Sequence, residues 1–230
     1  MNDDLTLDEK VAVFAQSRRF AQLDQSQLRR IASATTTCHF RKQELLFREE
    51  DTPKFFYIIQ KGRVKLVKTS LSGKSFIVHI ASPSNSLDSY VLLGGKGHDV
   101  SAEAMDDTTV LRMKREHYIS FLYDYPSIPV HSIEMLAQVV SSAYDRIVDL
   151  IGERVEQRLY NVLMMLNSKF GKNLRFTAEE IADLSGTTRE TAVRVLSRLR
   201  TSGVIGSYRG RITIIDPVRL REMGCSQYVL

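Results

Sequence analysis

Cysteine is scarce in this sequence: the 230 residues include only Cys38 and Cys225, which lie far apart in the chain. Two isolated cysteines exclude a disulfide framework and a zinc site built from cysteine pairs, and they favour a reducing cytoplasm. Long apolar runs are also missing, so we expect no membrane span. The first ten residues, MNDDLTLDEK, are acidic rather than basic and then apolar, so we expect no secretory signal.

The surplus of positive charge is confined to the last third of the chain. Residues 1–150 carry 19 Lys and Arg against 19 Asp and Glu, whereas residues 151–230 carry 13 against 8, a net charge of +5. A basic region attached to a neutral one favours a polyanionic partner for the basic part. A solvated basic surface would have the same composition, so charge alone does not decide between these interpretations.

Short segments rich in β-branched and aromatic residues occupy residues 38–113. They read FFYIIQ, RVKLVKT, SFIVHIA, VSAEAM and TTVLRM, and turn-like breaks such as Lys61-Gly62 and Ser72-Gly73 separate them. Strands at this spacing predict an antiparallel barrel or sandwich. Residues 7–34 have helical spacing and predict one or two short helices against the sheet. Together with the helices that follow, they predict an α+β chain with an N-terminal antiparallel barrel or sandwich.

A narrow apolar stripe follows the predicted strands at alternating intervals of three and four residues, formed by Ile133, Leu136, Val140, Ala143, Ile147 and Leu150. This a/d heptad pattern predicts a long helix. We favour pairing of the stripe with a symmetric copy, and packing on the chain's own strands is the alternative. Glycine is unfavourable inside a helix, so Gly152 predicts a break or hinge over residues 150–153. A second amphipathic helix follows and should end near Gly171.

The basic region contains two closely spaced capped helices within RFTAEEIADLSGTTRETAVRVLSRLRTSGVI. Thr177 and Glu180 form the sequence pattern of a capping box, and Gly186 supplies the turn. Thr187 or Thr188 caps the second helix, which should run to about Thr201. A short helix, a glycine-containing turn and a second helix are typical of a helix-turn-helix.

The second helix is amphipathic. Its core side should hold Ala192, Leu196 and Leu199, together with Val193 or Val195. Its charged side begins in the first turn, where a recognition helix meets base edges. Two further strands, VIGSY and RITIID, predict a hairpin wing whose arginines contact phosphates. The candidate DNA-binding residues are therefore Thr188, Arg189, Glu190, Thr191, Arg194 and Arg198 on the helix, and Arg209 and Arg211 at the wing.

The stretches GTTRETAVRVLSRLRTSGVI and FYIIQKGRVKLVKT, with a long helix between them, resemble the superfamily of the bacterial cyclic-AMP receptor protein and the fumarate–nitrate regulator. The resemblance covers nearly the whole chain. It implies a β-roll sensor over residues 1–125, a dimerisation helix over 126–151 and a winged helix-turn-helix over 152–230. It also implies a homodimer on a palindromic operator, a TGTGA-like half-site read by Arg189, Glu190 and Arg194, and contact with RNA polymerase if the protein is an activator.

Cyclic-nucleotide-binding relatives have a Gly-Glu pair before a short apolar helix and an Arg-Ser or Arg-Thr pair after it, and in them the arginine binds the cyclic phosphate and the glutamate binds the ribose. In the resembling stretch, SLDSYVLLGGKGHDVSAEA, these pairs become Asp88-Ser89 and His98-Asp99. The arginine is missing and two acidic residues are present, which would repel a phosphate. Lys96 cannot reproduce the two-pronged hydrogen bonding of arginine. We therefore expect an effector other than cyclic AMP or GMP.

Other effectors stay open. An iron–sulfur cluster is disfavoured, because it needs about four cysteine ligands. Haem needs only one or two axial ligands, and relatives that sense gases hold haem in this region, so His98 and then His79 are candidate ligands. Tyr90 and Met105 are candidates to line a pocket for a small organic ligand. Oxidation of Cys38 is a third route, and constitutive activity is a further alternative.

Two other classes of function are less consistent with the sequence. A phosphotransferase using GGKGH would lack the spacing of a phosphate-binding loop, and no catalytic acid pair or triad emerges, so we do not expect an enzyme. A module that binds only a partner protein would not account for the concentrated positive charge. For a regulator, we expect the effector to shift the long helix and to rotate the winged helices about the predicted hinge.

Overall fold

The computed structural model describes residues 4–87, 89–208 and 210–224, and the chain packs as two units, Met1–Val139 and Val140–Leu230. The first unit contains most of the strands. Its helical elements are α1 (Leu7–Ala15), η1 (Arg18–Phe20), α2 (Gln25–Ser33), η2 (Ser89–Leu93) and α3 (Arg115–Asp124). Its strands are β1 (Thr35–Phe40), β2 (Leu45–Phe47), β3 (Phe55–Lys61), β4 (Val64–Thr69), β5 (Ser75–Ala81), β6 (Ser86–Leu87), β7 (Ser101–Ala104) and β8 (Thr108–Lys114).

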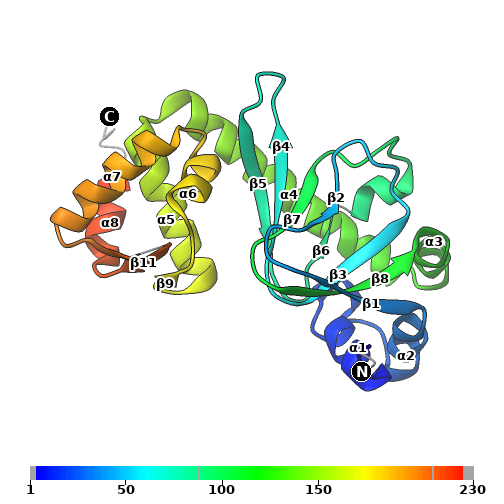
Figure 1. Cartoon of the computed structure of the whole chain (residues 1–230). Coiled ribbons are helices and arrows are strands. Elements are labelled where there is room, and N and C mark those ends of the chain that lie inside the picture. The colour runs from blue at the N-terminus through cyan, green and yellow to red at the C-terminus, as the bar shows by residue number, and fades with distance from the viewer. Residues whose placement is uncertain (1–3, 88, 209, 225–230) are drawn as a thin grey trace. The chain divides into compact units, whose positions relative to one another are not determined.

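Two four-stranded antiparallel sheets form the roll, with strand orders β1-β8-β3-β6 and β2-β7-β4-β5. The predicted β-roll is thus confirmed, and each of the five predicted segments forms a strand. The strand β1, the short strands β2 and β6 and the helix α3 were not among the predicted segments, because each is too short or too mixed in composition to show a clear period. Helices α1 and α2 lie together beside β1 at one end of the roll (Figure 1).

Strand β3 is buried on both faces, which explains why FFYIIQ is apolar throughout instead of alternating. Side chains alternate between the faces of a strand. Phe56 and Ile58 pack with the helices in one core cluster, whereas Tyr57 and Ile59 face the second sheet in another. The sheet that contains β3 is therefore the middle layer between the helices and the second sheet.

The long helix α4 (Ser127–Gly152) begins and ends within one residue of the predicted range. The division between the two units falls inside it, at Val139 and Val140, and not at either of its ends. Arg154 has an extended backbone (φ −64°, ψ 150°) and precedes the next helix, so the predicted break is present. Like every helix among the described residues, α4 is not long and apolar enough to cross a membrane.

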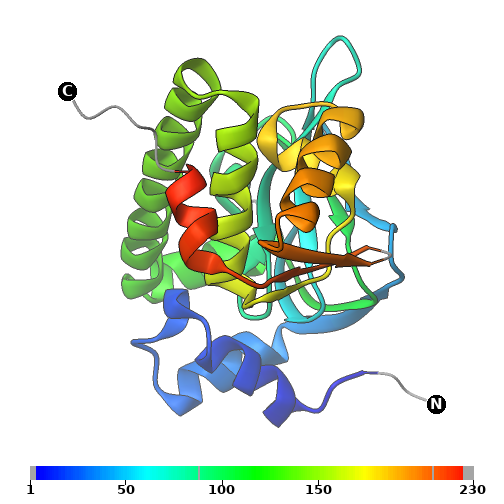
Figure 2. The same ribbon diagram turned by 90° about the vertical axis from the view of Figure 1, so that its left-hand side faces the viewer.

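The second unit packs helices on a small sheet. Besides the end of α4 it contains α5 (Val155–Phe170), α6 (Ala178–Ser185), α7 (Arg189–Thr201) and α8 (Pro217–Gly224), with β9 (Asn173–Leu174), β10 (Ile205–Tyr208) and β11 (Arg211–Ile214). The sheet order is β10-β11-β9. Figure 2 shows α8 lying along α5 and the β10–β11 hairpin beyond the end of α7. The helix-turn-helix and its wing are therefore present, and α8 was not predicted.

Candidate nucleic-acid interface and effector region

Local capping determines where the two helices of the helix-turn-helix begin. The Thr177 hydroxyl accepts a hydrogen bond from the Glu180 backbone N–H at 3.1 Å, and the Glu180 carboxylate accepts one from the Thr177 N–H at 2.7 Å. Gly186 ends α6 in the left-handed conformation (φ 63°), where a side chain would be strained. Thr188, and not Thr187, caps α7 by accepting from the Thr191 N–H at 3.3 Å. The predicted turn is thus formed by side chains that cap backbone N–H groups and by a left-handed glycine.

Helix α7 buries one side and exposes the other. The buried residues are Ala192, Val195, Leu196 and Leu199. Val195 therefore takes the core position that the sequence left open, and Val193 is 47% exposed. The candidate contacts Thr188, Arg189, Glu190, Arg194 and Arg198 are all exposed, and Thr191 is partly exposed. A shallow depression runs along this side, lined by Val193, Arg194, Ser197, Arg198, Thr201 and Ser202.

The charged residues of α7 differ in their partners. Among the described residues, Arg189 and Arg194 form no ion pair, whereas Arg198 pairs with Glu156 of α5. Hydrogen bonds from its own backbone N–H and from the Thr188 hydroxyl lower the pKa of Glu190, so its carboxylate is charged at neutral pH. The first two turns of α7 thus offer free donors and one acceptor to an external ligand.

The wing carries the remaining predicted contacts. Arg211 is exposed at the first position of β11, next to the hairpin turn. Arg209 lies outside the described residues. The β10–β11 pair has the expected antiparallel register, with Tyr208 opposite Arg211.

Sequence reasoning missed two arginines that contact the turn itself. Arg146 of α4 and Arg158 of α5 donate hydrogen bonds to backbone carbonyls at the end of α6. The sequence offered no signal for them, because a charged residue between apolar positions of a helix is ordinarily a solvated one.

The apolar stripe of α4 is uncovered in the single chain. Ile133 is 67% exposed and Ile147 is 51% exposed, and Leu136, Val140, Ala143 and Leu150 are exposed as well. Further large apolar residues of α4 are exposed: Val130, Val139, Tyr144, Val148 and Ile151. The only fully buried residue of the helix is Ile128. An exposed apolar surface of this extent is typical of a protein–protein interface.

In the first unit, His98 is a packed residue. The residue is 5% exposed, and its ring stacks on Phe47, with the ring centroids 3.8 Å apart and the planes 14° from parallel. Its backbone N–H donates to Asp51 at 3.0 Å, and its carbonyl accepts from Glu50 at 2.8 Å. Gly97 lies so close to the same turn that a Cβ atom there would be 2.7 Å from the Glu50 carbonyl oxygen. The loop before β7 is therefore docked against residues 50–51.

Four other polar and charged residues of this region are linked by contacts, whereas Lys96 is exposed. The Tyr90 hydroxyl donates to the Asp99 carboxylate at 2.9 Å, and the Lys68 ammonium donates to the Asp99 carbonyl at 2.7 Å. Lys68 also forms an ion pair with Glu49 at 2.6 Å. Asp88 lies outside the described residues.

The structure brings only some of the candidate effector residues together. Ser89, His98 and Met105 are buried, whereas Tyr90 and Asp99 are exposed. His79 is exposed on β5 opposite Leu66. Cys38 is half-buried on β1, and Cys225 lies outside the described residues. Within the described part of the chain, no cluster of three or more His, Cys, Asp or Glu side chains is arranged to hold a metal ion.

Comparisons with known proteins cover both units. The Crp-like helix-turn-helix domain matches residues 157–223, and the cyclic nucleotide-binding domain matches residues 37–125. The nitrogen fixation regulation protein FixK of Bradyrhizobium diazoefficiens is 28% identical over 90% of this chain and 89% of its own. The cyclic AMP receptor protein of Thermus thermophilus is 28% identical over 77% of this chain and 83% of its own. The structure of FixK2 from Bradyrhizobium japonicum, 24% identical, superimposes with a TM-score of 0.74 over 84% of this chain and 98% of that one.

Proposed function

Since the chain belongs to the Crp/Fnr superfamily and is a DNA-binding transcription regulator of that type, we propose that it acts as a homodimer on a palindromic operator. The observation that carries this proposal is the exposed side of α7. Its first two turns present Arg189, Glu190 and Arg194 to solvent, while the opposite side is packed in the core. This is the part of a recognition helix that meets base edges in the major groove.

The residue types on α7 predict which bases are read. Arg189 and Arg194 would each donate two hydrogen bonds to a guanine, and Glu190 would accept one from the N4 amino group of a cytosine. A charged carboxylate is an acceptor only, which suits an amino group of a base. A TGTGA-like half-site fits this set. Thr188, Thr191, Arg198 and the wing arginines Arg209 and Arg211 would contact the phosphate backbone.

The uncovered stripe of α4 supports the homodimer. In a two-fold dimer, α4 of a second copy would pack its a/d positions against the same positions of α4 in the first copy and so cover the stripe. A two-fold dimer requires two half-sites one helical turn apart, about 34 Å along the DNA. The operator would therefore be palindromic, and an activator would in addition contact RNA polymerase. The site of action would be the cytoplasm, where the chromosome lies.

The effector of the β-roll would be something other than a cyclic nucleotide. His98 replaces the phosphate-binding arginine of relatives, and it is stacked on Phe47 and not directed at an open anion site. Asp99 adds a negative charge beside it, and Tyr90 and Lys68 already bind this residue. A phosphate there would have to displace these contacts and face a carboxylate. A small organic ligand, a redox signal at Cys38 or constitutive activity are the alternatives.

Haem does not fit His98 in this conformation. One face of the ring is covered by Phe47, and the backbone on both sides is hydrogen-bonded to residues 50–51. An axial bond forms through a ring nitrogen in the plane of the ring. His98 is 5% exposed, so iron could reach that nitrogen only if the loop before β7 moved away from residues 50–51. His79 is exposed on a strand surface. An absorbance spectrum of protein purified with iron present tests both residues, and a Soret band would restore the haem hypothesis.

Selection of binding sites from random duplex DNA tests the proposed function. We expect a palindrome with TGTGA-like half-sites and an affinity that falls steeply with salt concentration. Glu190→Ala should relax the preference at one cytosine by about 1–3 kcal/mol. Glu179→Ala, which removes an exposed carboxylate from α6, should leave the preference unchanged. An unchanged preference in Glu190→Ala would contradict the assignment of Glu190 to a cytosine. Failure to select any sequence would contradict the proposal of a specific operator.

A further inference from the structure

The turn between α6 and α7 is held by side chains from outside the helix-turn-helix. The last carbonyl groups of an α-helix have no partner within the helix. At the end of α6, the carbonyls of Leu184, Ser185 and Gly186 all accept hydrogen bonds from arginine side chains. Positive charge at this position also meets the negative end of the helix dipole. The turn that sets the direction of α7 is therefore tied to other helices.

Arg158, in the first turn of α5, uses all three nitrogens of its guanidinium group. Nε donates to the Ser185 carbonyl at 3.0 Å and Nη2 to the Gly186 carbonyl at 3.3 Å. Nη1 donates to the Glu153 carbonyl at 3.2 Å, at the break between α4 and α5. One side chain thus joins this break to the turn before α7. A lysine could not replace it, because an ammonium group is a single point and not a planar fork.

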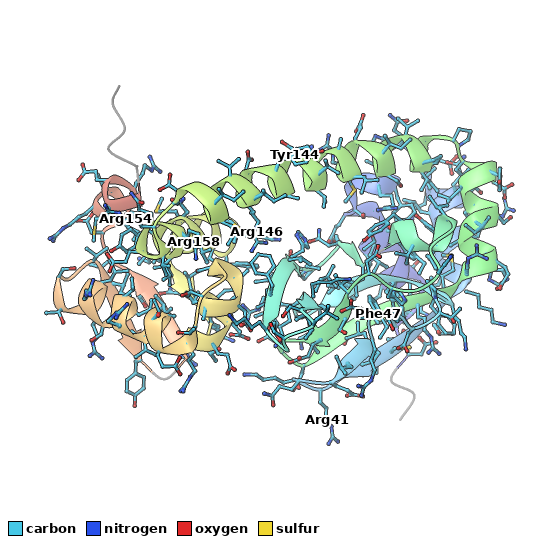
Figure 3. All side chains as sticks on the ribbon, turned by 90° about the horizontal axis from the view of Figure 1, so that it is seen from above. Arg41, Phe47, Tyr144, Arg146, Arg154 and Arg158 are labelled. Carbon is cyan, nitrogen blue, oxygen red and sulfur yellow. The ribbon has the colours of Figure 1, made fainter. Side chains whose placement is uncertain are left out.

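Arg146 reaches the same turn from α4. Its Nη2 donates to the Leu184 carbonyl at 2.8 Å. Burial lowers the pKa of Arg146, although nearby Asp149 opposes the shift. A desolvated cation is costly unless it is hydrogen-bonded, and the end of α6 supplies that partner. Figure 3 shows Arg146 and Arg158 near each other where α4 meets α5.

We propose that Arg146 and Arg158 are positioning residues that determine which half-site spacing the dimer accepts. In a dimer built on α4, the position of each α7 relative to α4 determines the distance between the two recognition helices. The backbone joins α4 to α5 through Glu153 and the extended residue Arg154, which by themselves leave the angle between the helices variable. The two arginines restrict that angle, because they bind the same turn from both sides of the break. The inference rests on the proposed function.

Full-length protein and two sets of duplexes test the inference. One set carries a single half-site, and the other carries two half-sites separated by spacers of increasing length. Wild-type protein should show one sharp optimum of spacer length. For Arg158→Met, the affinity for the best palindrome should fall about tenfold or more, because a misplaced second helix contributes little avidity. Its affinity for the single half-site should change little, and the spacer optimum should broaden.

Three variants accompany this measurement. Arg158→Lys should not restore the sharp optimum, and Arg146→Met should broaden it in the same way. Arg221→Met removes one positive charge from the exposed surface of α8 and should leave the spacer profile unchanged. Thermal unfolding is followed in parallel, and Arg146→Met provides the comparison if Arg158→Met does not fold.

Two results would overturn the inference: equal losses on the single half-site and the palindrome, or a spacer profile that does not change. Equal losses would mean that the arginines support the fold or supply charge only. If the wild-type protein binds DNA as a monomer or binds none, the proposed function itself fails and the inference falls with it. The wild-type measurement therefore distinguishes the two failures.

Discussion

Helix α7 and the segment from Ser86 to Ala104 use their charged side chains in opposite ways. On α7, Arg189 and Arg194 are exposed and form no ion pair within the described residues. Around the segment, Asp99 accepts from Tyr90, and Lys68 binds both Asp99 and Glu49. A surface with unpaired cations can bind a polyanion without losing internal contacts, whereas a region whose charges are satisfied must first break them. A phosphate could therefore bind the arginines of α7 without displacing an ion pair, whereas at the segment it would have to displace the contacts of Asp99 and Lys68.

The proposed dimer depends on the exposed stripe of α4, so the largest effect is expected there. Val140→Asp would bury a carboxylate and its symmetric copy without a partner. The affinity for a palindromic operator should fall about a hundredfold or more, because the second half-site no longer contributes. Sedimentation equilibrium should show a monomer. Ser142→Asp, which lies off the stripe on α4, is the control, and a Val140→Asp dimer would contradict the assignment of the stripe.

A smaller loss is expected when one unpaired cation of α7 is removed. Arg194→Ala should cost about 1–3 kcal/mol at one guanine, or roughly five- to 150-fold in affinity. Titration of labelled operators that carry each of the four bases at that position measures the effect. Arg194→Ala should bind all four operators with similar, reduced affinity. Arg200→Ala removes an exposed arginine from the last turn of the same helix and should preserve discrimination. Loss of affinity without loss of discrimination would assign Arg194 to the phosphate backbone.

Val193 offers a sharper and smaller test of the same surface. It is exposed among the candidate contacts and lines the depression on α7, where an apolar side chain suits a thymine methyl group. Replacing that thymine by deoxyuridine removes one methyl, which should weaken binding by about 0.8 kcal/mol, or roughly fourfold. Val193→Ala should be insensitive to the same replacement. Equal sensitivity of both proteins would show that Val193 does not contact the methyl.

The smallest effect is expected from a cyclic nucleotide at the β-roll. Cyclic AMP should cause no shift in the thermal unfolding midpoint, whereas a ligand that binds the folded state would raise the midpoint further with each increase in ligand concentration above its Kd. His98→Arg alone should not create binding, since Asp99 and the docked loop remain. Calorimetric titration of both proteins checks this expectation. Saturable binding of cyclic AMP to the wild-type protein would show that the β-roll does accept a phosphate-containing ligand.

The helix-turn-helix was predictable because its signals are local. The capping box of Thr177 and Glu180, the left-handed Gly186 and the cap at Thr188 each depend on residues within a few positions. The break after Gly152 was predictable for the same reason. The strands were predicted by composition, but β2 and β6 needed partners to form and had no period of their own.

The sequence by itself determined the class of fold, the helix-turn-helix and the apolar stripe of α4, because periodicity and capping act between neighbours in the chain. Only the tertiary structure decided that Val195 and not Val193 enters the core, and that His98 stacks on Phe47. It also joined Arg158 to the carbonyls of the α6–α7 turn. These outcomes depend on which surfaces pack together, and contacts between distant residues leave no fixed spacing in a single sequence.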